Sequence, residues 1–366
     1  MKRIKEKLLC AALLSCMALS ACSGRASSQS TAQEAQKGEA SEVEMSASSE
    51  SHESVEAESK KKTKITFCLD WTPNTNHTGI YAAIAKGYYE EEGLEVEVVQ
   101  PPENGAALMC ASGQAQFAID AQDTMAASLA LDEPLGITAV SAIIQHNTSG
   151  IISRKGDGIG SPSGLSNKTY STWNSPIELA MLKKVVNDDG GNFDSVKLIP
   201  NDITDEPAAL AAGQTDAIWV FEGWGYINSK VEKVDCDYFG FADVDPVFDY
   251  YTPVIIGNND FLKENSETAK AFLRATQKGY EFAMNNPKEA ADMLIEGDST
   301  GSLQGAKELV YASQEFLSAN YAKEGEVFGV IDEARWNNFY KWLYDNGLCG
   351  KDLTGVGFSN DYLPAE

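Results

Sequence analysis

Residues 64–99 read KITFCLDWTPNTNHTGIYAAIAKGYYEEEGLEVEVV, and this stretch decides the fold class. Residues 64–69 turn Ile65, Phe67 and Leu69 to one face, as a half-buried strand does. Apolar residues between 80 and 88 recur at helical spacing, and residues 94–99 read as a second strand. The order strand, helix, strand predicts a βαβ unit with parallel strands.

The same alternation continues on both sides of one interruption. Before it, we expect helices near 105–112 and from 123 onward, with strands at 116–120 and 137–144. The interruption is a glycine- and serine-rich run at 153–166, typical of a domain crossing or an exposed loop. After it, we expect strands at 168–172, 196–199 and 216–221, with helices around 177–185 and 206–212.

The last third of the chain predicts a return to the first half. An apolar strand at 254–256 follows Tyr250-Tyr251-Thr252-Pro253, and the tail from 266 onward is mainly helical. Two α/β lobes joined by two crossings form a hinged clamshell, with a ligand site at the carboxyl ends of the strands and between the lobes. The predicted limits are 63–155 for the first part of lobe I, 156–251 for lobe II and 252–366 for the return and C-terminal helices.

The N-terminus predicts export. A basic start precedes an apolar stretch at 8–19 that is too short to cross a bilayer comfortably, so residues 1–21 read as a signal peptide. Leu19-Ser20-Ala21-Cys22 resembles a bacterial lipobox, which makes Cys22 the expected lipidation site and the cell membrane the expected location. The alternative is cleavage elsewhere, with Cys22 incidental. Residues 22–62 are rich in Ser, Ala, Gln and Glu and predict a disordered tether.

Charge and cysteine usage narrow the function further. The net charge of −25 argues against nucleic-acid binding, which needs a basic face. Four cysteines remain in the body, at Cys68, Cys110, Cys236 and Cys349, and they lack the paired spacing of a zinc site. We expect small buried thiols, although the sequence does not decide whether any pair forms a disulfide.

The residues after the predicted strands are aromatic and polar. Trp71, Trp173 and Trp224 suit a flat ring, and Glu222 could accept two N–H bonds from an aminopyrimidine edge or stand at a helix start. Further candidates have structural alternatives as well. Asp70 could hold its own loop, His77 could bond to backbone, and Asn76 and Asn174 could be caps or turn formers. Trp219 lies inside a predicted strand and is expected in the core.

These loops favour a neutral or cationic solute. They contain no Lys or Arg, while Asp70, Asp123 and Glu222 are acidic, which argues against an oxyanion. The sequence has no Walker loop, no Gly-x-Ser-x-Gly elbow and no His-Glu-x-x-His. With three histidines, one of them in the tether, a His-based triad or metal cluster is hard to assemble. We therefore predict no catalytic residues, no metal and no cofactor.

Five segments resemble the NMT1/THI5-like family. They are LDWTPNTNHTG at 69–79, AKGYY at 85–89, GLEV at 93–96, PPENG at 101–105 and DAIWVFEGW at 216–224. Within that family, the chain looks most like lipoprotein solute-binding subunits of ABC importers for thiamine pyrimidine precursors. The resemblance implies a type II-like two-lobed periplasmic-binding-protein fold. It also implies a formylaminopyrimidine- or hydroxymethylpyrimidine-like ligand between the lobes, near Trp71, Asn76 and Glu222.

The resemblance implies partners and leaves alternatives. A membrane permease and its ATPase would receive the ligand. The family also includes eukaryotic pyrimidine synthases that use a cysteine cluster with iron and a pyridoxal phosphate substrate, and this sequence has no such cluster. A riboflavin-like, sulfonate or nitrate ligand, an enzyme of the synthase type, and a surface adhesin or scaffold remain the other hypotheses.

Overall fold

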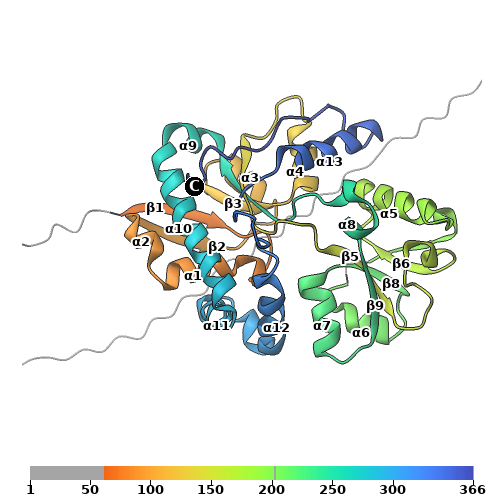
Figure 1. Cartoon of the computed structure of the whole chain (residues 1–366). Helices are drawn as coiled ribbons and strands as arrows, with labels where there is room; N and C mark the ends of the chain where they lie inside the picture. Colours follow the sequence, from red (N-terminus) through yellow and green to blue (C-terminus); the bar gives the residue numbers. More distant parts are fainter. Residues whose placement is uncertain (1–61, 202, 366) are drawn as a thin grey trace, which may run out of the picture. The chain divides into compact units, whose positions relative to one another are not determined.

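The structure is a computed structural model that describes residues 62–201 and 203–365. The predicted signal peptide, the Cys22 lipidation site and nearly all of the predicted tether lie outside the described residues. The described chain forms two five-stranded sheets, each covered by helices (Figure 1). This is the α/β architecture that the alternation of strands and helices predicts.

The first sheet has the strand order β2-β1-β3-β10-β4. Its strands are β1 (Thr63–Cys68), β2 (Leu94–Val99), β3 (Phe117–Asp120), β4 (Ile137–Ala142) and β10 (Val254–Asn258). Strands β1, β2 and β3 are parallel, and β10 runs antiparallel between β3 and β4. The predicted βαβ opening and the return of the strand at 254 are therefore confirmed.

The second sheet has the order β7-β6-β8-β5-β9. Its strands are β5 (Ser149–Arg154), β6 (Thr169–Thr172), β7 (Lys197–Pro200), β8 (Ala217–Phe221) and β9 (Cys236–Gly240). Strands β6, β7 and β8 are parallel, whereas β5 is antiparallel to both β8 and β9. Each sheet thus inserts one antiparallel strand into a mainly parallel arrangement.

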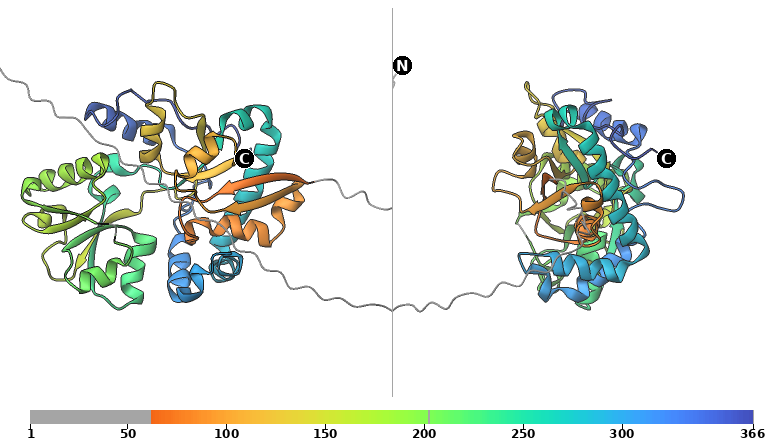
Figure 2. Two further views of the ribbon diagram at one scale, coloured as in Figure 1. Left: turned by 180° about the vertical axis from the view of Figure 1, so that it is seen from behind. Right: turned by 90° about the vertical axis from the view of Figure 1, so that its left-hand side faces the viewer.

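Two groups of helices accompany the sheets (Figure 2). Those of the first sheet are α1 (Thr78–Ala85), α2 (Tyr88–Glu91), α3 (Ala106–Ala111), α4 (Gln122–Leu129), α9 (Asn259–Glu264), α10 (Ser266–Asn285), α11 (Pro287–Gly297), α12 (Lys307–Ser318) and α13 (Glu333–Asp345), with short turns η1 (Thr75–His77) and η6 (Ser302–Gly305). Those of the second sheet are α5 (Pro176–Asp188), α6 (Glu206–Ala211), α7 (Ile227–Val231) and α8 (Phe241–Val244), with η2 (Pro162–Leu165), η3 (Phe193–Ser195), η4 (Glu222–Tyr226) and η5 (Pro246–Phe248).

Successive side chains along a strand point to opposite faces of its sheet, and apolar side chains pack on both faces. Ile65 and Phe67 of β1 share a core with α1, α2 and α10, where Phe272 stacks on Tyr89 with ring centroids 5.2 Å apart. The neighbouring Cys68 faces the opposite layer, together with α3, α4 and α13. In the second sheet, Ile151 and Ile152 divide in the same way between the α5 side and the α6 side. The period of two in the strands therefore builds the cores on both faces of both sheets.

The predicted first lobe boundary and the observed sheets differ. Strand β5 precedes the boundary predicted at 155/156, yet it pairs in the second sheet, so the change of sheet falls between β4 and β5. Gly150 shows how tightly β5 is held, because a Cβ there would lie 2.2 Å from the Phe239 carbonyl oxygen. The glycine- and serine-rich run that follows contains exposed, half-buried and buried residues together with the short turn η2, so it is a partly packed loop and not the crossing between the sheets. The second change of sheet falls between β9 and β10, the stretch that contains the boundary predicted at 251/252.

The four body cysteines are free thiols, and Cys68, Cys110 and Cys349 are buried. Burial raises the pKa of Cys68 to about 11, and the negative charge of Asp70 adds to the shift. These thiols pack as small apolar groups, as expected. Between residues 62 and 365, apart from residue 202, no helix is long and apolar enough to span a bilayer.

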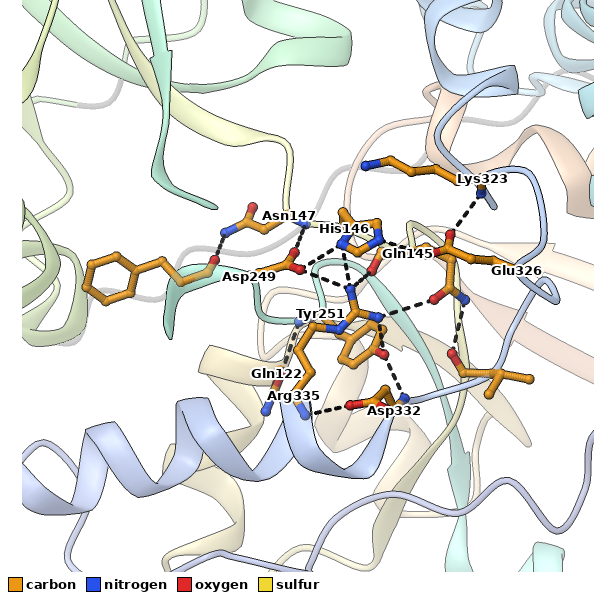
Figure 3. Close-up of polar contacts among 12 residues, drawn as sticks. Gln122, Gln145, His146, Asn147, Asp249, Tyr251, Lys323, Glu326, Asp332 and Arg335 are labelled. Carbon is orange, nitrogen blue, oxygen red and sulfur yellow. Dashed lines mark hydrogen bonds and ion pairs between the residues drawn. The ribbon is translucent and has the colours of Figure 1, made fainter. Parts of the chain in front are cut away.

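A polar network holds the two connections between the sheets (Figure 3). The Asp249 carboxylate of the second connection accepts the backbone N–H of Asn147, which belongs to the first, at 2.9 Å. Its other oxygen lies 3.1 Å from Nη1 of Arg335 in α13 and 2.7 Å from Nδ1 of His146. Arg335 Nη1 also donates to the Gln145 carbonyl at 2.5 Å. One carboxylate and one guanidinium therefore fix both connections to the same helix.

Replacing Asp249 by Asn should lower the free energy of unfolding by about 2–4 kcal/mol, because Arg335 loses a largely buried counter-charge. The matched control is Asp345→Asn, which removes the exposed ion pair with Lys341 and should leave stability nearly unchanged. Chemical denaturation measures both. Equal losses in the two variants would show that the network does not stabilise the connections.

Candidate functional site

A cavity of about 520 Å³ is lined by residues from both sheets and from α12. The lining consists of Asp70, Trp71, Thr72, Asn74, Thr75, Asn76, Ile144, Thr148, Trp173, Ile203, Thr204, Glu206, Phe221, Gly223, Trp224, Thr252, Pro253 and Leu317. Its volume falls in the range of small-molecule pockets.

Topology explains why these residues meet. Asp70 follows β1, Trp173 follows β6 and Phe221 ends β8, all of them at the carboxyl ends of parallel strands. Thr148 and Thr252 precede the antiparallel strands β5 and β10, whose beginnings lie at that same edge. Each sheet therefore contributes the edge at which open α/β sheets bind ligands.

The aromatic part of the lining is unusually accessible. Trp71 is 64% exposed and Trp173 is 53% exposed, and Phe221 also presents a large free surface. Trp224 completes this set of four aromatic side chains. Large apolar rings that remain accessible in a folded protein usually mark a binding surface.

The loop that carries Trp71 is held by a buried histidine. The backbone N–H of Asn74 donates to His77 Nδ1 at 3.2 Å, so the other ring nitrogen carries the proton and donates to Asp70 Oδ1 at 2.8 Å. His77 is fully buried, while Asp70 lines the cavity. His77 therefore orients Asp70 rather than lining the cavity itself, and one Asp70 oxygen remains for a ligand.

A buried carboxylate holds the Trp173 loop in a similar way. Glu178 in the first turn of α5 accepts the Tyr170 hydroxyl at 2.8 Å, the Thr172 hydroxyl at 2.9 Å and the Trp173 backbone N–H at 3.3 Å. Asn174 takes a left-handed conformation with φ of 62°, which Asn tolerates better than most residues. The Asn174 side chain is exposed and is outside the cavity lining, so the residue serves as a turn former here.

The two sheets also meet through a chain of hydroxyl groups beside the cavity. The Thr75 and Ser313 hydroxyl oxygens lie 2.5 Å apart, and the Ser313 hydroxyl also donates to the Gly223 carbonyl. A Cβ on Gly223 would lie 2.9 Å from Leu317 Cδ2, so α12 packs directly against the η4 backbone. Helix α12 thus joins the loop after β1 to the turn after β8.

The structure places the predicted Glu222 and the unpredicted Glu206 differently with respect to the cavity. Glu222 begins η4, a π-helical turn, and is not among the residues that line the cavity. Burial raises the Glu222 pKa; the nearby Lys230 lowers it and Asp243 raises it. Burial raises the pKa of Tyr226, and the negative charge of Glu222 raises it further. The acidic residues in the cavity lining are therefore Asp70 and Glu206.

Glu206 stands at the start of α6, where the sequence predicts a helix but gives no sign of a site. Burial raises the Glu206 pKa to about 7, with Asp205 as a further cause in the same direction. No salt bridge joins Glu206 to a Lys or Arg in the described part of the chain. A carboxyl group with this pKa can give or accept a proton near neutral pH.

The charge of the cavity has one sign. Asp70 and Glu206 are acidic, and none of the described lining residues is Lys or Arg. Within the same described residues, no group of three or more His, Cys, Asp or Glu side chains is arranged to hold a metal ion. Of the predicted site residues, the structure brings Asp70, Trp71, Asn76, Trp173 and Trp224 together at the cavity.

A family model described as NMT1/THI5 like matches residues 74–290. The chain belongs to the NMT1/THI5-like family. The match spans most of the cavity lining, from Asn74 to Pro253, and includes Glu206. The family resemblance seen in the sequence is thereby confirmed.

Individual relatives agree with this assignment. The chain is 30% identical over 278 residues to the formylaminopyrimidine-binding protein of Halalkalibacterium halodurans, covering 75% of this chain and 83% of that protein. It is 25% identical over 248 residues to the 4-amino-5-hydroxymethyl-2-methylpyrimidine phosphate synthase THI13 of Saccharomyces cerevisiae, covering 62% and 69%. The family therefore contains both a binding protein and a synthase.

A solved structure confirms the fold. The alkanesulfonate-binding protein SsuA of Xanthomonas axonopodis pv. citri, bound to MOPS, superimposes with a TM-score of 0.61 at 10% identity. The match covers 82% of this chain and 99% of SsuA. The fold is that of periplasmic binding proteins, as predicted.

The raised pKa of Glu206 makes stability pH-dependent. The folded state keeps the proton up to about pH 7, whereas the ordinary value is 4.5, so the charge destabilises the fold as the pH rises between these values. Glu206→Gln should therefore raise the free energy of unfolding at pH 8 by about 1–3 kcal/mol and change little near pH 4. The exposed Glu324→Gln is the control. Thermal unfolding against pH measures both; a pH-independent difference would contradict the burial of the charge.

Proposed function

We propose that this chain is the extracytoplasmic solute-binding component of an ABC importer, and that it captures a thiamine pyrimidine precursor. The observation that carries the proposal is the cavity itself, in which four aromatic side chains accompany two carboxyl groups. A flat ring can stack on the indoles, and amino groups on that ring can donate to the carboxyl oxygens. The name of the relative at 30% identity, a formylaminopyrimidine-binding protein, supports the same ligand class.

Charge distinguishes this ligand class from oxyanions. A sulfonate or nitrate in this cavity would meet Asp70 and Glu206 with no basic partner among the described lining residues. Like charges at a few Å repel strongly where water is partly excluded. A neutral or cationic heterocycle has no such cost and would also gain from the π faces of Trp71 and Trp173.

The proposal includes the cellular setting. Cys22 would carry the lipid that keeps the protein at the outer face of the cell membrane, and residues 22–62 would tether it there. A membrane permease with its ATPase would receive the solute. Ligand capture would favour the conformation that makes contacts from both sheets at once.

A calorimetric panel tests the ligand class with 4-amino-5-hydroxymethyl-2-methylpyrimidine, N-formyl-4-amino-5-aminomethyl-2-methylpyrimidine, riboflavin, an alkanesulfonate and nitrate. We expect binding of the aminopyrimidines. Trp173→Ala should weaken it by about 1–3 kcal/mol, because a stacking face is lost. The control is Tyr344→Ala, a similarly exposed aromatic residue outside the lining. Binding of the oxyanions alone would overturn the proposal, and formation of a pyrimidine product on incubation with pyridoxal phosphate and iron, seen by mass spectrometry, would make the chain an enzyme.

A pair of isosteric variants identifies the acidic partner of the ligand. Glu206→Gln should weaken aminopyrimidine binding by about 1–3 kcal/mol, because a buried charged acceptor is replaced by a weaker one. Glu222→Gln should leave the affinity within about 0.5 kcal/mol, since Glu222 lies outside the lining. Titration calorimetry at pH 8 compares the two. The opposite ranking would restore the assignment that the sequence alone suggests.

A further inference from the structure

A second, smaller cavity adjoins the first beneath Trp173. It measures about 20 Å³ and is lined by Ser171, Trp173, Asn201, Ile203, Glu206, Ile218 and Trp219. Three of these residues, namely Trp173, Ile203 and Glu206, also line the main cavity. We call this space the side cavity. Its volume suits one water-sized atom.

One residue that lines the side cavity, Trp219, has a buried donor with no acceptor among the described residues. Trp219 is 5% exposed, and its indole Nε1–H is buried with no hydrogen-bond acceptor among the described protein residues. The ring is fixed by packing, with Phe241 at 4.1 Å and Trp173 at 5.8 Å between ring centroids. A buried N–H without an acceptor costs about 1–3 kcal/mol. We therefore expect a water or ligand oxygen to accept the Trp219 N–H.

A contrast within the same chain supports this reasoning. Trp336 in α13 is more deeply buried than Trp219, yet its Nε1–H donates to the Val356 carbonyl at 2.9 Å. A buried indole in this protein can therefore have a protein acceptor for its N–H, as Trp336 does. Trp219 has no such protein acceptor among the described residues, and it lines the side cavity.

We propose that the side cavity is a subsite for a single hydroxyl-type oxygen, which accepts the Trp219 N–H and donates to one of the surrounding acceptors, Glu206 first among them. The Ser171 hydroxyl donates to the Asn201 carbonyl at 3.2 Å, so its proton is already used within the protein. The inference rests on the proposed function in one respect, namely that the oxygen can belong to the ligand. A bound water is the other source of the same chemistry.

The subsite would determine specificity. A heterocycle stacked against Trp173 lies over the opening of the side cavity, because Trp173 and Glu206 border both spaces. A ligand with a hydroxyl substituent could place that oxygen on the indole N–H, whereas its deoxy analogue would leave the donor unsatisfied. Losing a hydrogen bond to a buried donor weakens binding about 5- to 100-fold.

Nuclear magnetic resonance of the full chain with ¹⁵N-labelled tryptophan tests the subsite. The chain has six Trp residues, and Trp219→Phe assigns the indole resonance of interest. A cross-peak between the Trp219 indole proton and a long-lived water in the ligand-free protein would identify water as the source. A shift of that resonance with 4-amino-5-hydroxymethyl-2-methylpyrimidine, but not with 4-amino-2,5-dimethylpyrimidine, would identify the ligand hydroxyl. The Trp336 indole, which has a protein acceptor, should show neither effect.

Calorimetry on the same two pyrimidines separates this inference from the proposed function. If the ligand supplies the oxygen, the wild-type protein should prefer the hydroxymethyl compound about 5- to 100-fold, and Trp219→Phe should abolish the preference while still binding both. Binding of both compounds with a Trp219 resonance that shows no water contact and no shift would overturn the subsite but not the function. If neither pyrimidine binds but the Trp219 indole still contacts a long-lived water, the proposed function is overturned and the subsite is not.

Discussion

The arrangement of the two sheets depends on the hydrogen bonds and the ion pair of the Asp249 carboxylate. The chain passes between the sheets twice, and Asp249 binds the backbone of Asn147 in one passage while pairing with Arg335 from the C-terminal helix α13. Arg335 also lies over the Tyr251 ring, with its guanidinium carbon 4.2 Å from the ring centroid. The three segments are far apart in sequence, so none of them could fix the connection alone. Because the cavity draws its lining from both sheets, its shape follows from this connection.

Buried polar groups hold the loops around the cavity, whereas accessible polar groups line it. His77 and Glu178 are buried and are not part of the lining, yet they hold the loops that present Asp70 and Trp173. Their own hydrogen bonds are satisfied within the protein, which leaves the accessible groups free for a ligand. Rigid support of this kind lowers the entropy that binding must overcome. Glu206 differs, because it is partly desolvated without a basic partner, and its raised pKa records that environment.

The spacing of apolar residues predicted those strands and helices that have a regular period in the sequence. The β1–α1–β2 opening was predictable because strand and helix periods stand side by side between residues 64 and 99. Strand β5 has both faces buried and lacks alternation, and strand β9 gives no clear alternation because its first three residues are all half-buried. The site divided in the same way. Trp71 and Trp173 follow strands, a position visible in sequence, whereas the roles of Glu222 and Glu206 depend on how η4 and α6 turn their side chains. No local signal carries that information.

The fold is shared with proteins of different ligand chemistry, so the fold does not select the ligand. SsuA, bound to MOPS in its crystal structure, has the same fold at 10% identity. In the present chain, the corresponding edges of the sheets carry carboxyl groups and indoles without a basic residue among the described lining. Over a few Å in a partly dry cavity, reversing the sign of a neighbouring charge changes the interaction energy by several kcal/mol. Ligand preference in this fold therefore resides in a few loop residues. In this chain the candidates for that role are the indoles and the two carboxyl groups of the cavity lining, and Glu206 lines the side cavity together with Trp219.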